Sequence, residues 1–219
     1  LEEAERMFGH LKPGLATSRP NAVYHGGDRR EVKDLEQAHV AMAFEGPAYA
    51  DEDFYAMQLM SVALGGGMSS RLFQEVREKR GLAYSVYASM QQFAGGGILS
   101  LYAGCNPEKT REVTAIFRDV LGDVVNSGLS DEELERAKGQ VAGSMVLGQE
   151  DTGSRMVRIG KSELVYGEIK SMDEILASVR SVDQGQISEL ASEIFTVQPT
   201  LAVVGPYKKS TAFASAVSK

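Results

Sequence analysis

The sequence predicts an α+β fold in which a largely antiparallel sheet carries helices on one face. Several segments alternate apolar and polar residues with period two, whereas others repeat apolar residues every three or four positions. The expected order is two strands, two helices, two strands, several helices and one strand. Grouped strands and grouped helices favour an antiparallel sheet over a parallel one. With 219 residues and 43% hydrophobic content, the chain can bury a substantial core.

The beginning of the chain is predicted to be the end of a helix that belongs to a preceding unit, residues 1–14. Its apolar residues share one helical face: Leu1, Ala4, Met7, Phe8 and Leu11. Two prolines, a glycine and small polar residues follow, so that residues 15–35 are expected to hold a linker and a first strand. The strand is placed at residues 22–26, and GDRREVKD is interpreted as a polar turn. Residues 36–219 are then the main domain.

The first half of this domain contains a strand, two helices and a strand pair. The strand QAHVAMAFEG alternates apolar residues, and residues 51–64 are apolar nearly all round, as in a buried helix. A second helix is expected at residues 69–80. Residues 83–90 and 95–104 then read as two strands of a hairpin.

The second half is mostly helical. Asn106 and Pro107 begin a helix that Gly128 ends, and capping-box spacings at Ser130 and Ser171 begin two more. Further helices are expected at residues 152–166 and around 187–194, followed by the closing strand TLAVVG, residues 200–205.

Composition excludes several classes of function. A net charge of −7 opposes the phosphate attraction on which nonspecific nucleic-acid binding depends, so no nucleic-acid partner is expected. No apolar run approaches the roughly 20 residues that span a bilayer, so no membrane partner is expected either. The single cysteine, Cys105, favours a reducing compartment, the cytoplasm, with the mitochondrial matrix or the periplasm as alternatives.

Three glycines, Gly65, Gly66 and Gly67, end the buried helix. They do not form a phosphate loop, because they follow a helix and precede no lysine. Two interpretations stay open: they supply left-handed backbone for a sharp turn between helices, or they form a loop that faces substrate.

No metal site is legible. The histidines His10, His25 and His39 lack the spacing of a helical zinc pair, and one cysteine cannot build a zinc site. His39 is interpreted as a hydrogen-bonded structural residue, and Cys105 is expected to pack at a strand end.

Arg77 and Tyr84 are the remaining candidates for chemistry. Period-two alternation places Tyr84 on the side of Val86 and Ala88, opposite Tyr87. Spacing alone favours a solvated charge near a helix C-terminus for Arg77 and a core residue for Tyr84.

The segment GGGMSSRLFQEVREKRGLAYSVYA closely resembles the hallmark of the second homologous domain in the pitrilysin/insulinase superfamily of zinc metallopeptidases, in its mitochondrial-processing-peptidase-like branch. DLEQAHVAMAFEGP, YAGCNPEKT and TLAVVGP resemble the same domain. The resemblance implies one of two similar α+β halves that face each other across a chamber.

The resemblance implies a C-terminal half that binds unfolded peptides. Arg77 and Tyr84 match the family's arginine and tyrosine, so Tyr84 would stabilise an oxyanion and Arg77 would hold substrate, with Gly65, Gly66 and Gly67 nearby. Zinc, with its His-x-x-Glu-His motif, would lie in the complementary N-terminal half. This chain lacks that motif and is expected to be inactive alone. The alternatives are a partner subunit or a non-catalytic scaffold of the same fold, and a homo-oligomer also stays open.

Overall fold

The computed structural model describes residues 1–12, 14 and 22–207. Within these residues a five-stranded sheet has the order β1-β5-β2-β4-β3. The strands are β1 (Gly27–Val32), β2 (Ala38–Gly46), β3 (Ala83–Phe93), β4 (Gly96–Cys105) and β5 (Thr200–Gly205). β2 pairs antiparallel with β4 and β5, and β3 with β4, whereas β1 runs parallel to β5. The predicted α+β class with a largely antiparallel sheet is confirmed.

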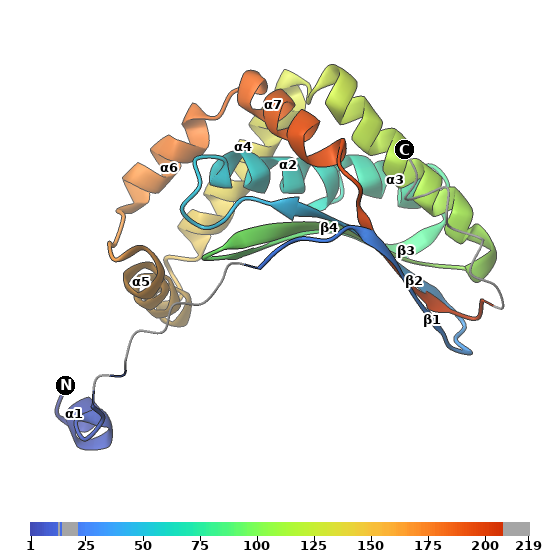
Figure 1. Ribbon diagram of the computed structural model, residues 1–219. Helices are drawn as coiled ribbons and strands as arrows, with labels where there is room; N and C mark the ends of the chain where they lie inside the picture. Colours follow the sequence, from blue (N-terminus) through green and yellow to red (C-terminus); the bar gives the residue numbers. More distant parts are fainter. Residues whose placement is uncertain (13, 15–21, 208–219) are drawn as a thin grey trace.

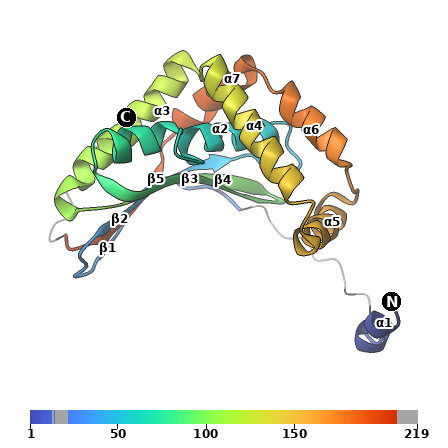
Figure 2. The same cartoon turned by 180° about the vertical axis from the view of Figure 1, so that it is seen from behind.

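The helices of this domain cover one face of the sheet and leave the other bare. They are α2 (Phe54–Gly65), η1 (Phe73–Glu78), η2 (Pro107–Lys109), α3 (Thr110–Ser127), α4 (Asp131–Leu147), α5 (Thr152–Tyr166), α6 (Met172–Ser181) and α7 (Gln184–Phe195). Figures 1 and 2 show α2, α3, α4 and α7 on the same side, and α5 beside one end of the sheet. A further helix, α1 (Glu2–Phe8), contributes no buried residue.

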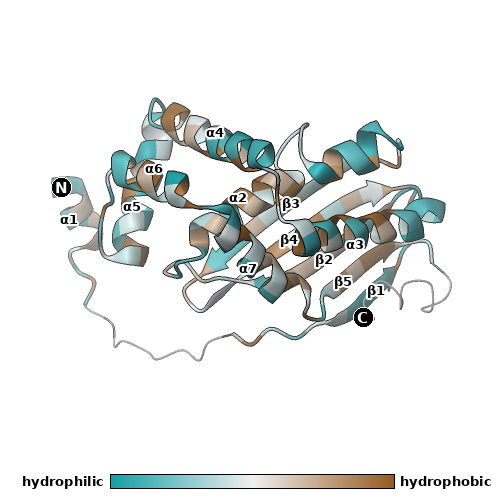
Figure 3. Cartoon of the chain, turned by 90° about the horizontal axis from the view of Figure 1, so that it is seen from above, coloured by the Kyte–Doolittle hydropathy of each residue, from teal (hydrophilic) through white to brown (hydrophobic). Residues whose placement is uncertain are grey.

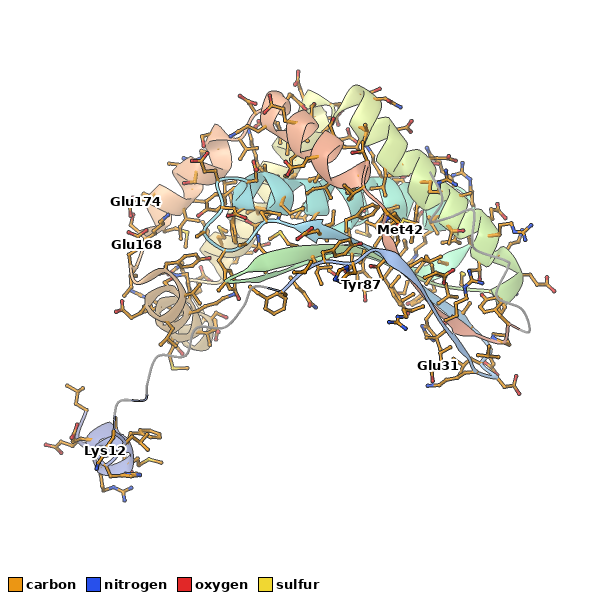
Figure 4. The ribbon with its side chains drawn as sticks, viewed as in Figure 1. Lys12, Glu31, Met42, Tyr87, Glu168 and Glu174 are labelled. Atoms are coloured by element: carbon orange, nitrogen blue, oxygen red, sulfur yellow. The ribbon has the colours of Figure 1, made fainter. Side chains whose placement is uncertain are left out.

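Alternation in the strands decides which side chains enter the core. In β2, Val40, Met42 and Phe44 are buried, whereas the residues between them are only half-buried. Figure 4 shows Met42 on the helix side of the sheet and Tyr87 on the bare side. Helix α2 is buried on nearly all sides between the sheet and the outer helices, which explains its almost wholly apolar sequence (Figure 3).

Side-chain caps fix the helix starts that the sequence predicted. Ser130 and Glu133 form a capping box at α4, and Ser171 and Glu174 form one at α6. A third box, which the sequence analysis did not identify, begins α7 at Asp183. These boxes satisfy amide groups that would otherwise lack partners at the helix N-termini.

The prediction for the first strand is wrong. Residues 22–26 form no strand, and the segment interpreted as a polar turn forms β1. β1 is an edge strand whose charged residues are tolerated because one side of it stays in water, and Arg30 pairs with Asp28. Its partner β5 is distant in sequence, so local composition could not reveal the pairing. Residues 15–21 of the expected linker, and residues 208–219 of the expected main domain, lie outside the described residues.

The expected helix at residues 69–80 also differs from the prediction. Half of it is the π-helix η1, in which the Lys79 amide donates to the Gln74 carbonyl, five residues back, at 2.9 Å. π-Helical turns are rare and often occur at functional sites.

Candidate functional site

A β-bulge at the start of β3 sets the position of Tyr84. Ala83 pairs with Cys105 and Ser85 with Gly104, so Tyr84 is an extra residue opposite a single step of β4. The bulge breaks the period-two alternation. Tyr84 is 79% exposed, whereas Val86 is buried.

The prediction that Tyr84 shares a side with Val86 and Ala88 is therefore wrong. Both of those residues are buried against the helices, and Tyr87, expected on the side opposite Tyr84, is also exposed. The alternative that Tyr84 is a core residue is wrong as well. Among the residues that the structure describes, none forms a hydrogen bond with its hydroxyl, which is free to bind another molecule.

Arg77 lies directly against Tyr84. Its Nη1 donates to the Tyr84 carbonyl oxygen at 3.0 Å, and its guanidinium carbon lies 4.6 Å from the centre of the Tyr84 ring. The same guanidinium lies 4.8 Å from the ring centre of Phe73, one turn earlier in η1. These cation–π contacts orient the tyrosine and leave further N–H donors of Arg77 unused.

Ion pairs hold η1 in place. Arg71, just before η1, donates from Nε to Glu133 Oε1 at 2.6 Å and from Nη2 to Glu133 Oε2 at 2.8 Å, and Nη2 also donates to the Gly128 carbonyl at 2.9 Å. The hydrogen bond from Arg71 lowers the pKa of Glu133 to about 2. Glu75 of η1 pairs with Lys79 and with Arg80 just after it, and these bonds lower the pKa of Glu75.

Two of the three glycines follow a packing requirement, and none of the three forms a left-handed turn. A Cβ on Gly65 would lie 2.0 Å from the Ala88 amide nitrogen, because the end of α2 touches β3. A Cβ on Gly66 would lie 2.7 Å from Val62 Cα, and the φ of Gly66 is −84°. Gly67 also lacks positive φ, so the first of the two interpretations, left-handed backbone for a sharp turn, is wrong.

A row of ring side chains that the sequence did not reveal crosses the bare face beside this site. His39 Nδ1 lies 2.7 Å from the Tyr102 hydroxyl, which confirms His39 as a hydrogen-bonded residue. The Tyr102 ring stacks on Tyr87 with centroids 4.9 Å apart, and burial raises the pKa of Tyr102. The register that pairs Tyr87 with Tyr102 creates this row, and no single-strand pattern contains that register.

Comparison with known families decides the family of this chain. Residues 1–141, more than half of the chain, match the family described as peptidase M16 inactive domain. The chain belongs to this family. The resemblance to the pitrilysin-type zinc metallopeptidases is thereby confirmed.

Relatives of this M16 inactive domain are named as zinc proteases. An uncharacterized zinc protease of Streptomyces coelicolor is 51% identical over 180 residues, which cover 82% of this chain and 39% of that protein. The uncharacterized zinc protease YmxG of Bacillus subtilis is 35% identical over 207 residues, 94% of this chain and 51% of that protein. The chain thus spans about two-fifths to one-half of the length of these relatives.

Solved structures show the same fold. A peptidase M16 inactive domain from Pseudomonas fluorescens superposes with a TM-score of 0.78 at 22% identity, covering 91% of this chain and 48% of that one. A chain of complex III2 from Candida albicans superposes with a TM-score of 0.79 at 17% identity, covering 94% of this chain and 52% of that one.

The described residues of this M16 inactive domain do not offer a zinc site. No three or more histidine, cysteine, aspartate or glutamate side chains among them gather closely enough to hold a metal ion. His39 bonds a tyrosine, and the thiol of Cys105 is buried beside Thr110 at the end of β4, as expected. None of the helices described is both long and apolar enough to cross a membrane.

Proposed function

We propose that this chain is the C-terminal half of a zinc metalloendopeptidase that degrades or processes unfolded peptides. The observation that carries the proposal is the contact in which Arg77 fixes the ring and carbonyl of Tyr84 while the exposed Tyr84 hydroxyl stays unbonded. A rigidly held donor without a partner suits an oxyanion that forms only during reaction. The relatives named zinc proteases extend well beyond the matched region, which supports a complementary half.

The residues of this chain would act on the substrate as follows. The Tyr84 hydroxyl would donate to the carbonyl oxygen under attack, which gains negative charge in the transition state. The free donors of Arg77 would bind a neighbouring backbone carbonyl of the peptide. Gly65, Gly66 and Gly67 would lie along the same peptide, although Gly65 is buried against β3. Because the described residues do not fit zinc, the metal would belong to the complementary half.

The proposed partner is that N-terminal half, or a separate subunit that carries zinc. The bare face of the sheet supports this proposal, since no helix of the described chain covers it (Figure 1). Exposed apolar residues of the first segment support it too, because they have no cover within the described chain: Leu1, Met7, Phe8 and Leu11. A cytoplasmic location and the absence of nucleic-acid partners remain part of the proposal, consistent with the free thiol of Cys105 and the charge of −7.

The test replaces Tyr84 in the assembled two-half enzyme. Tyr84→Phe is expected to lower kcat for a fluorogenic peptide by roughly 10²-fold, the scale of losing one oxyanion donor, with little change in KM. The melting temperature should stay unchanged, because the hydroxyl has no partner in the described chain. Tyr87→Phe is the matched control on the same strand, and it should leave kcat unchanged because its ring already stacks on Tyr102.

Arg77→Ala should raise KM and lower kcat together, since Arg77 both binds substrate and holds Tyr84. Unchanged turnover in Tyr84→Phe would overturn the catalytic role of Tyr84. It would favour the alternative in which this chain is a non-catalytic scaffold.

A further inference from the structure

A separate cavity of about 590 Å³ lies at the end of the sheet beside α5. Its walls come from α5, the end of α4, the start of α6 and the segment that leads into α2. Figure 1 shows α5 set apart from the other helices at this end of the domain, and Figure 4 marks Glu168 on the connection from α5 to α6. Volumes of this size hold small organic ligands or one or two amino-acid residues.

The cavity is positively charged in a protein of net charge −7. Four basic residues line it, against two carboxylates. Both carboxylates are already engaged: Asp51 accepts from the Ala48 amide at 2.6 Å, and Glu168 pairs with Lys170 at 3.5 Å. Within the described part of the chain, the other three basic residues form no ion pair: Arg155, Arg158 and Lys161.

Arg158 is the most constrained of these cations. It is half-buried, and its Nη1 donates to the Lys170 carbonyl oxygen at 3.3 Å. Its Nε is shielded from water and has no hydrogen-bond partner among the described residues. Because Nε is closed off even from water, a ligand in the cavity would meet this guanidinium at its terminal nitrogens, of which Nη2 has no hydrogen-bond partner among the described residues.

Other parts of the cavity lining are aromatic and aliphatic. Tyr49 and Tyr166 meet edge to face with centroids 6.1 Å apart, and Lys161 Nζ lies 4.9 Å from the centre of the Tyr49 ring. Phe54 and Ile175 add apolar surface. An apolar group bound here would therefore lie beside cations that have no ion-pair partner among the described residues.

We propose that this cavity binds a carboxylate attached to an apolar side chain, the chemistry that the C-terminal residue of a peptide presents. The carboxylate pairs with Arg158, with Arg155 and Lys161 nearby, and the side chain packs on the tyrosines. Guanidinium groups bind carboxylates through two parallel hydrogen bonds, which gives the contact its direction. This inference does not depend on the proposed peptidase role, because binding is measured on this chain alone.

The test is calorimetric titration of the 219-residue chain with N-acetyl-phenylalanine and with its amide. The carboxylate is expected to bind with a Kd of about 1 mM or below, and the amide at least about tenfold more weakly, since only the acid offers a charge. Arg158→Gln should weaken binding of the acid at least about tenfold while binding of the amide stays the same. Lys109→Gln is the charge-matched control, because Lys109 lies outside the cavity lining and pairs with Glu112.

Three results would overturn the proposal: equal affinity for acid and amide, no heat from the acid at concentrations of about 10 mM, or inorganic phosphate binding as tightly as the acid. A melting curve of Arg158→Gln, compared with the unsubstituted chain, shows whether the variant is folded. If it is not, Lys161→Gln replaces it, with the same expected loss.

Discussion

The ion pair between Arg71 and Glu133 should make stability depend on pH in a way that one substitution isolates. Glu133→Gln removes the negative charge but keeps a side chain that can accept the Ser130 amide, which donates to Glu133 Oε2 at 2.7 Å. The capping box of α4 is therefore expected to remain, and the loss of stability should come from the broken Arg71–Glu133 ion pair, which holds the start of η1.

The magnitude follows from the pKa of Glu133, which is about 2 in the folded chain against an ordinary value of 4.5. Each unit of this pKa difference corresponds to about 1.36 kcal/mol, so the carboxylate of Glu133 stabilises the folded chain by at most about 3.4 kcal/mol. Because the carboxylate side chain is still 18% exposed and water screens the pair, we expect about 1–3 kcal/mol. Since folding lowers this pKa, the stabilisation is complete above pH 4.5 and is lost as the pH falls towards 2.

The assay is urea unfolding of the chain and of Glu133→Gln, followed by circular dichroism from about pH 7 to about pH 3. The difference in unfolding free energy between the unsubstituted chain and Glu133→Gln should be largest at neutral pH and decrease as the solution becomes acidic. Glu132→Gln is the matched control, because Glu132 pairs with Arg136 while its side chain is 81% exposed, and it should cost less than about 0.5 kcal/mol. A difference for Glu133→Gln that does not vary with pH, or that equals the control, would refute the reasoning.

Two further substitutions test the packing around the site. Gly65→Ala should lower the melting temperature and reduce the unfolding free energy by about 1–3 kcal/mol, because its Cβ would meet the Ala88 backbone at 2.0 Å. Gly122→Ala on α3 is the control, and since its Cβ would meet nothing within 4 Å it should stabilise the chain by about 0.5–1 kcal/mol. An unchanged melting temperature in Gly65→Ala would contradict the close contact. Tyr102→Phe should lower the unfolding free energy by about 0.5–1.5 kcal/mol, because His39 Nδ1 loses its partner at 2.7 Å. No change in urea unfolding for Tyr102→Phe would show that this hydrogen bond contributes nothing.

The sequence by itself determined the features that depend on neighbours along the chain. The starts of α4 and α6 follow from Ser130 and Ser171, because a capping box involves residues three positions apart. β2 follows from its alternation, and α2 from its apolar content. The proximity of Arg77 and Tyr84 was also predictable, since only seven residues separate them across one turn.

Only the tertiary structure decided the features that depend on register and distant partners. β1 is a strand because β5 pairs with it, although its own residues are mostly charged. Tyr84 is exposed because β3 gains one residue against β4 at that point, and a single inserted residue reverses the face that alternation assigns. Arg155, Arg158 and Lys161 all lie on α5, but their lack of ion-pair partners depends on which side chains the neighbouring elements bring beside them, and no pattern within one helix shows that.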